Sequence, residues 1–260
     1  MDPQDIIRHI ETEREKGGFE LNLSSQEIDD LKPFIHLFQD FHIIDLGGNR
    51  LQTLPPEIGE LTRLHELYLS GNRLDSLPDA ICQLKSLENL CIDDNAFEHL
   101  SVSVCRLPSL KTLHISLNPL TTLPPEIGNL TRLDDLYAHN CRIKTLPAEI
   151  GNLANVRIIY LSDNRIETLP PDIGRLSKLE LLHLDNNRLE AVPDEITHLH
   201  NLDILNLADN FLETIPKSLG RMPSLTRIYL YDNLMIDPPM TVVEKGSKAV
   251  LDYLRGEATS

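Results

Sequence analysis

The sequence contains no tryptophan, and aromatic residues make up only 5% of it. It also lacks any run of about 18 consecutive apolar residues, the length that a membrane-spanning helix requires. Residues 1–18 are charged and contain no apolar stretch of the kind found in secretory signals. We therefore expect a cytoplasmic protein without membrane insertion, whose core is built from many aliphatic side chains.

Motifs for catalysis are missing as well. The 260 residues contain no phosphate-binding loop, no dinucleotide-binding glycine pattern, and neither a GxSxG nor a HExxH sequence. The cysteines show no CxxC spacing of the kind that binds zinc; they are Cys82, Cys91, Cys105 and Cys141. The sequence thus predicts a non-enzymatic protein with no cofactor and no metal site.

Basic residues are scarce: 24 Lys and Arg stand against 40 Asp and Glu, which gives a formal net charge of −16. Such a surface repels phosphate groups, which argues against nucleic acid and anionic membranes as partners. It favours a protein partner with a basic, partly apolar surface, although part of the charge also serves solubility.

A 23-residue period runs through most of the chain. Asn or, once, Cys recurs at nine positions of one grid, within the pattern L-x-x-L-x-L-x-x-N-x-L-x-x-L-P-x-x-I-x-x-L. A fixed period of this length is typical of solenoids, and this motif is that of leucine-rich repeats. The nine grid residues, termed the ladder positions below, are Asn49, Asn72, Asn95, Asn118, Cys141, Asn164, Asn187, Asn210 and Asn233.

Each part of the repeat has its own physical role. The leucines before the ladder position alternate with period 2, which predicts a short strand with one buried face. The ladder side chain is expected to turn inward and bind backbone groups, with Cys141 as a structural substitute. The proline that follows suits the start of a short helix, where no backbone N–H is needed.

The ends of the repeat region depart from the pattern. Residues 1–18 are expected to form an N-terminal capping helix, and residues 19–240 the repeats, of which the first is degraded. Residues 241–255 carry an apolar stripe at helical spacing and are expected to form a C-terminal capping helix. Residues 256–260 are expected to be a tail.

The recurring sequence LPPEIGNLTRL resembles the intracellular leucine-rich repeats of the Ras group, plant members included. The resemblance covers residues 19–239, and the closing PPMTVVEKGSKAVLDYLRG is similar to a C-terminal cap of that class. It implies an α/β horseshoe with a parallel β-sheet on the concave face and short helices or 3-10 turns on the convex face. It also implies a scaffold in signal transduction whose partner is a small GTPase or a regulator of one.

The concave face is expected to expose the residues six, four and two positions before each ladder position. Five of the six tyrosines fall in these columns, beside three aliphatic residues and an acidic edge. Exposed apolar and aromatic residues mark partner surfaces, although tyrosines also stabilise strands and acidic residues also serve solvation. The predicted partner-binding residues are Tyr137, Tyr160, His183, Tyr229, Tyr231, Ile158, Leu181, Ile204, Asp163, Asp185 and Asp209.

An alternative function of a different class rests on the cysteines. Cys91 and His114 are expected to be neighbours on adjacent strands, close enough for a Cys–His pair or a metal ion. Cys82 and Cys105 lie one repeat apart, where other repeats have glycine, and a thiol pair would allow a redox response. The alternative is therefore a structural repeat protein that responds to redox conditions or to metal.

Overall fold

Every repeat forms a three-residue strand where leucines alternate with other residues before the ladder position. The middle residue of each strand is buried, while its two neighbours point to the other side of the sheet. The computed structural model describes residues 3–256, which belong to two compact units, residues 1–120 and residues 121–260.

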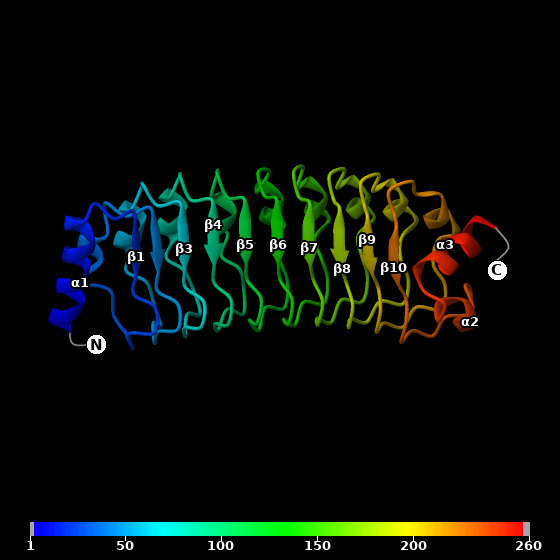
Figure 1. Cartoon of the computed structure of the whole chain (residues 1–260), viewed down its shortest axis with the longest axis horizontal. Helices are drawn as coiled ribbons and strands as arrows, with labels where there is room; N and C mark the ends of the chain where they lie inside the picture. Colours follow the sequence, from blue (N-terminus) through cyan, green and yellow to red (C-terminus); the bar gives the residue numbers. More distant parts are fainter. Residues whose placement is uncertain (1–2, 257–260) are drawn as a thin grey trace. The chain divides into compact units, whose positions relative to one another are not determined.

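Within residues 3–120, the first unit contains one α-helix and five parallel strands that pair in chain order (Figure 1). The registers are in step with the 23-residue repeat, because Tyr68 pairs with Cys91 and Cys91 with His114. The elements are α1 (Pro3–Glu15), β1 (Glu20–Asn22), β2 (Ile43–Asp45), β3 (Glu66–Tyr68), β4 (Asn89–Cys91) and β5 (Thr112–His114).

The second unit contains five further parallel strands, again paired in chain order, and two helices. Its elements are β6 (Asp135–Tyr137), β7 (Ile158–Tyr160), β8 (Leu181–His183), β9 (Ile204–Asn206), β10 (Arg227–Tyr229), α2 (Met240–Val243) and α3 (Ser247–Arg255). The expected solenoid with a parallel sheet is thus confirmed.

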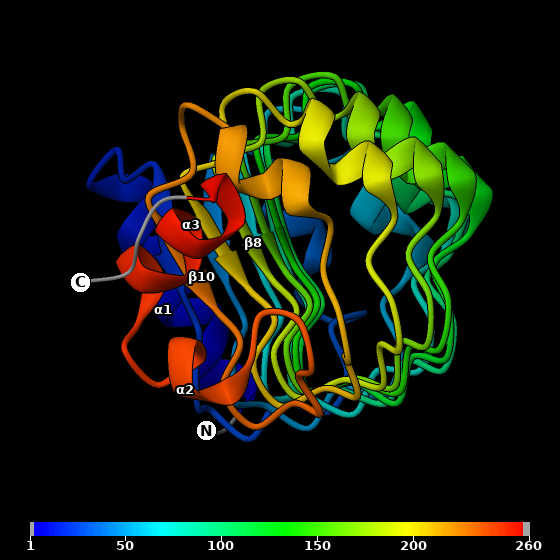
Figure 2. The ribbon, with the colours of Figure 1, turned by 90° about the vertical axis from the view of Figure 1, so that its right-hand side faces the viewer.

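Short 3-10 segments cover the side of the core that lies opposite the strands (Figure 2). Seven of the nine follow a proline in extended conformation or close to it, as the LP pair of the repeat predicts. They are η1 (Ile35–Leu37), η2 (Pro56–Glu60), η3 (Asp79–Gln83), η4 (Val104–Arg106), η5 (Pro125–Asn129), η6 (Ala148–Asn152), η7 (Pro171–Arg175), η8 (Asp194–His198) and η9 (Lys217–Arg221).

Glycine in these segments permits close packing of one turn on the next. A Cβ added at Gly151 would lie 2.4 Å from the carbonyl oxygen of Asp172, which no real side chain tolerates. Cys82 occupies the equivalent position one repeat before η4, and η4 is shorter than η2 or η3. A non-glycine residue at this position does not by itself shorten the next segment, because Thr197 occupies it before η9, which has five residues.

The ladder asparagines point into the core, as predicted, and join each repeat to the one before it. The amide of Asn187 donates to the carbonyl oxygens of Leu161, Leu184 and Asp185 at 2.9, 3.0 and 3.3 Å. Its Oδ1 accepts the backbone N–H of Ile166 at 2.9 Å. One amide therefore satisfies up to four backbone groups that face away from water.

The residue before each ladder position adopts the left-handed conformation, with φ between 50° and 69°. This turn aims the next side chain inward, and it favours Gly, Asn and Asp. The residues in this column are Gly48, Gly71, Asp94, Leu117, Asn140, Asp163, Asn186, Asp209 and Asp232.

The helices lie at the ends of the repeat series. Ile6 and Ile10 of α1 are buried. The region expected as one C-terminal helix contains two, α2 and α3, separated by Gly246 at φ +90°. The hydroxyl of Ser247 donates to Ile228 O of β10 at 2.8 Å, which occupies a backbone acceptor of that strand. None of the helices in residues 3–256 is long and apolar enough to cross a membrane.

Removing one rung of the ladder should destabilise the protein. Asn118 is 3% exposed and makes four bonds to backbone groups of its own unit, and Asn118→Ala leaves those groups unpaired. We expect a loss of roughly 1–3 kcal/mol in the free energy of unfolding, measured by urea titration. Asn129→Ala, at an exposed position of η5, is the control. Equal effects of the two changes would contradict the role of the ladder.

Leu117 should be replaceable with a gain in stability. It is 47% exposed and has φ +58°, a conformation that is costly for leucine and well tolerated by asparagine. We expect Leu117→Asn to raise the free energy of unfolding by about 1 kcal/mol. Leu234→Asn is the matched control, since Leu234 is 59% exposed and has negative φ. A similar gain at Leu234 would show that backbone strain is not the cause.

Candidate functional site

The strand face, meaning the side of the sheet turned away from the core, carries a row of stacked rings in the second unit. Tyr137 and Tyr160 stack with centroids 5.3 Å apart and planes 12° from parallel. His183 continues the row, 4.6 Å from the ring of Tyr160. These rings come from β6, β7 and β8, which the registers place side by side. All three are half-buried, so each offers only part of its surface to a partner.

A row of aliphatic residues runs beside the rings. Ile158, Leu181 and Ile204 are the first residues of β7, β8 and β9, and they are mutual Cα partners. We expected them to be exposed, and the structure shows them half-buried because strand neighbours cover part of each. They line a shallow pocket of about 380 Å³, together with Glu180, Asn201 and Asp203.

The two acidic residues of this pocket are held by arginines of adjacent repeats. Glu180 accepts two bonds from the guanidinium of Arg157, at 2.9 Å each, and this pair lowers the pKa of Glu180. Asp203 accepts bonds from the Thr226 hydroxyl and, at 2.7 Å, from Arg227, and these bonds lower its pKa. Both carboxylates therefore stay charged at neutral pH beside the aliphatic floor.

The sequence reasoning did not single out these rim residues. Glu180 and Asp203 precede Leu181 and Ile204 directly, so they occupy one column, seven positions before the ladder position. The sequence feature that could have identified them is this shared column, in which two adjacent repeats have an acidic residue next to an aliphatic one.

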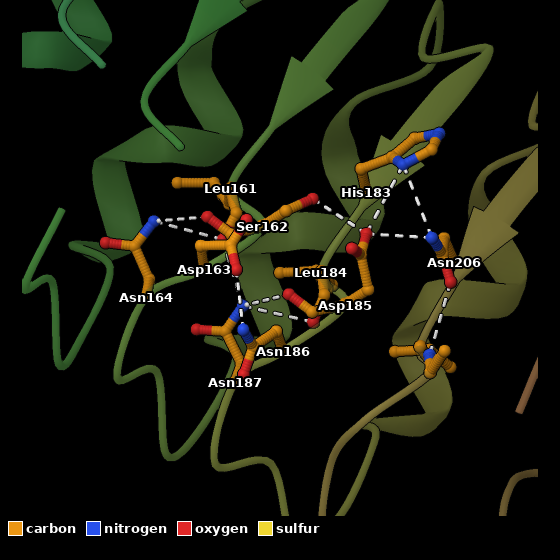
Figure 3. Close-up of polar contacts among 12 residues, drawn as sticks. Leu161, Ser162, Asp163, Asn164, His183, Leu184, Asp185, Asn186, Asn187 and Asn206 are labelled. Atoms are coloured by element: carbon orange, nitrogen blue, oxygen red, sulfur yellow. Dashed lines mark hydrogen bonds and ion pairs between the residues drawn. The ribbon is translucent and has the colours of Figure 1, made fainter. Parts of the chain in front are cut away.

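Asp185 is the centre of a polar network on the same face (Figure 3). One of its oxygens, Oδ1, accepts the Ser162 hydroxyl at 2.7 Å and the Asn206 amide at 2.8 Å. The same oxygen lies 3.4 Å from Nδ1 of His183. The carboxylate therefore holds the imidazole against Tyr160, and its main role in this geometry is to position His183.

The predicted acidic edge has a backbone explanation. Asp163 and Asp209 are exposed, but both adopt φ +56° in the left-handed column. Aspartate is among the few residues that this conformation favours. Asp163 also accepts the side-chain amide of Asn186 from the next repeat. The edge therefore follows from turn geometry, whatever else it contributes.

The third expected column, two positions before the ladder, is exposed only at some repeats. Ser116, Ser162 and Ala208 are buried, contrary to expectation, because small side chains at the turn are covered by larger neighbours such as Asp185. Tyr231 in the same column is 51% exposed and meets Tyr229 edge to face, with ring centroids 6.5 Å apart. Tyr229 itself is half-buried.

The strand residues of the first unit are mostly polar, although the rings of Phe19, His42 and His65 form a row just before β1, β2 and β3, with centroids 5.2 and 5.1 Å apart. Tyr68 donates its hydroxyl to Glu66 and accepts the Asn89 amide at 3.2 Å, and the bond to Glu66 raises the pKa of Tyr68. Asp45 and Ser70 are half-buried. The first unit offers no row of aliphatic residues like that of β7, β8 and β9: the equivalent residues of β3, β4 and β5 are Glu66, Asn89 and Thr112.

The cysteines do not form a reactive site in this geometry. Cys91 and His114 are strand neighbours, as predicted, but Cys91 is 7% exposed. Burial, followed by the charge of Asp93, raises the pKa of Cys91 to about 12, which keeps the thiol protonated. Cys82 is half-buried and Cys105 is buried, and no disulfide joins them. The described residues contain no cluster of three or more His, Cys, Asp or Glu side chains that could hold a metal ion.

Comparison with known sequences and structures gives the following matches. The profile of the family described as "Leucine-rich repeat region" matches residues 21–145 and 136–228. No curated protein matches the sequence. Among solved structures, the chain is similar to the plant peptide hormone receptor RGFR1 in complex with RGF2, with 26% identity and a TM-score of 0.67.

Two further solved structures match the chain. The Toll–Spatzle complex of Drosophila matches with 24% identity and a TM-score of 0.74, over 82% of this chain and 29% of that chain. A leucine-rich repeat protein of Leptospira interrogans shares 29% identity, over 86% of this chain and 73% of that chain, with a TM-score of 0.40. The match to the plant receptor covers 82% of this chain, which spans about a third of the receptor's length, 34%.

The ion pairs of the pocket should make stability depend on pH in a defined direction. The pKa of Asp203 lies below its ordinary 3.8 in the folded state, so the stabilisation is present above that value and is lost as the pH falls through the lowered pKa. We expect Asp203→Asn to lower the free energy of unfolding at pH 7 by an amount typical of an exposed ion pair, under about 1 kcal/mol. The difference should shrink on acidification below pH 3.8.

Calorimetric melting curves from pH 7 to acid pH measure this effect. Glu190→Gln serves as the control, because it removes an exposed carboxylate with no ion-pair partner among the described residues. A difference between wild type and Asp203→Asn that grows on acidification would show that the sign is wrong.

Proposed function

Because this chain belongs to the leucine-rich repeat family, we propose that it is a non-enzymatic protein that binds a protein partner on the strand face of residues 121–260. Leucine-rich repeats are in general an interaction fold. The plant receptor to which the chain is similar was solved in complex with RGF2, which supports a protein ligand here.

One observation carries the proposal. The half-buried rings of Tyr137, Tyr160 and His183 lie beside an aliphatic pocket with charged carboxylates at its rim. Rigid aromatic rings and aliphatic side chains lose little entropy when a partner covers them, and such groups dominate binding energy at interfaces. The second unit combines them over adjacent strands.

The pocket and the net charge of the chain together favour a partner with a basic and partly apolar surface. Glu180 and Asp203 are paired with Arg157 and Arg227, so the rim of the pocket is polar and its charges are balanced. Ile158, Leu181 and Ile204 offer a floor for an apolar side chain. The net charge of −16 further favours encounter with a basic protein and raises its rate of association.

The biological setting follows from the resemblance of the repeats to the Ras group. We propose an intracellular scaffold in signal transduction, with a small GTPase or a regulator of one as partner. Four cysteines that form no disulfide with one another, three of them buried, suit the reducing conditions of the cytoplasm.

Two substitutions test the location of the site. Tyr160→Ala removes the middle ring of the stack, and Leu181→Ala removes the centre of the aliphatic row. We expect each to weaken partner binding by at least about 2 kcal/mol, because both lie where a partner would exclude water. Calorimetry with a partner isolated by affinity capture measures the loss.

Matched changes in the first unit are the controls. Asp45→Ala and Ser70→Ala alter half-buried polar positions on the strand face of the first unit, where no row of aliphatic residues lies, and should cost under about 0.5 kcal/mol. All four variants are compared at equal folded fraction, checked by thermal melting. Larger losses at Asp45 and Ser70 would place the site on the first unit; no loss at any of the four would exclude the strand face.

A further inference from the structure

The repeat pattern is broken at the surface in the last two repeats, away from the strand face. Directly after the ladder position, the preceding repeats of the second unit have arginine: Arg142, Arg165 and Arg188. The last two have Phe211 and Leu234, which are 50% and 59% exposed. Two residues further on in each repeat, three successive repeats have glutamate: Glu167, Glu190 and Glu213. The last repeat has Ile236 at this position, and it is 67% exposed.

These apolar residues lie together. The backbone N–H of Ile236 donates to Glu213 O at 2.7 Å, and Leu212 donates to the Asn233 side chain at 3.0 Å. The segment from Phe211 to Glu213 therefore runs directly beside the segment from Leu234 to Ile236. Core packing does not explain three large exposed apolar side chains at positions where the preceding repeats of the second unit are polar.

A pocket of about 400 Å³ opens next to Phe211. It is lined by Glu167, Thr168, Arg188, Glu190, Ala191 and Phe211. The carboxylates of Glu167 and Glu190 form no hydrogen bond or ion pair within the described residues, and neither does that of Glu213. The pocket thus combines one aromatic ring with two carboxylates that form no ion pair among the described residues, and Arg188 also belongs to its lining.

We propose that this edge patch, defined as Phe211, Leu234, Ile236 and the carboxylates of Glu167, Glu190 and Glu213, binds an extended basic–apolar peptide segment of a protein partner. A Lys or Arg side chain enters the pocket, where the carboxylates bind its charge and the ring of Phe211 stacks on it. An apolar side chain of the same segment covers Leu234 and Ile236. Arg188 donates to carbonyl oxygens of the peptide backbone.

The spacing of the two contacts follows from the repeat. Adjacent repeats are about 4.8 Å apart, so the pocket and the Leu234–Ile236 end of the patch are separated by about 10 Å. An extended chain covers that distance in about three residues, at about 3.3 Å each. The segment therefore carries its basic and its apolar side chain about three positions apart.

Selection of phage-displayed random peptides on the full chain tests the proposal. The comparison protein carries Phe211→Arg, Leu234→Arg and Ile236→Glu, which restore the pattern of the other repeats and should leave folding intact. Peptides retained by the wild type should carry Lys or Arg about three positions from an apolar residue, and should bind the triple variant at least tenfold more weakly. Thermal melting verifies that both proteins are folded.

A synthetic copy of a selected peptide then separates charge from apolar contact. Glu167→Gln with Glu190→Gln should weaken its binding at least fivefold, whereas Glu149→Gln in η6 should not. Leu181→Ala on the strand face should leave it unchanged, which distinguishes this surface from the proposed site there. Equal binding by the triple variant, or enrichment of acidic peptides, would overturn the proposal. So would dimerisation of the wild type alone in sedimentation, because the occupant would then be a second copy.

Discussion

The buried amide of the ladder asparagine is the interaction on which the rest of each repeat depends. At the turn that follows each strand, backbone carbonyl groups face the core and bind the ladder side chain. The Asn187 amide reaches three carbonyls and one N–H, two of these groups in the preceding repeat. Without this amide, packing of the leucines of adjacent repeats would bury backbone N–H and carbonyl groups that have no hydrogen-bond partner.

This constraint fixes the chemistry of neighbouring positions. An inward-pointing amide needs a residue with left-handed backbone conformation before it. The positions of Asp163, Asn186 and Asp209 therefore have Asp or Asn because these residues tolerate positive φ. The small residues of the turn, such as Ser162, follow from the same geometry. The positions left free to vary are the strand residues that face away from the core and the residues just after the ladder.

The period alone was enough to predict the strands, the ladder, the buried leucines and the proline-led turns, since each depends on contacts that recur in every repeat. Features that depend on which residue occupies the next repeat were not predicted. The half-burial of Leu181, the binding of His183 by Asp185 and the pairing of Asp203 with Arg227 are of this kind. The sequence pattern does not reveal that Asp163 has a positive φ, and for this reason we predicted that it belongs to a docking edge.

A departure from the consensus is therefore most informative where it lowers the free energy of unfolding. Leu117 occupies a left-handed position that asparagine would fill at lower free energy, and Phe211 and Leu234 expose apolar surface where arginine would not. None of these residues adds to the packing of the core, because the leucines already fill it and the ladder side chains already bind its polar groups. Folding of a repeat does not require these residues. The positions that all repeats share stabilise the fold, whereas the positions that differ give each part of the surface its own binding properties.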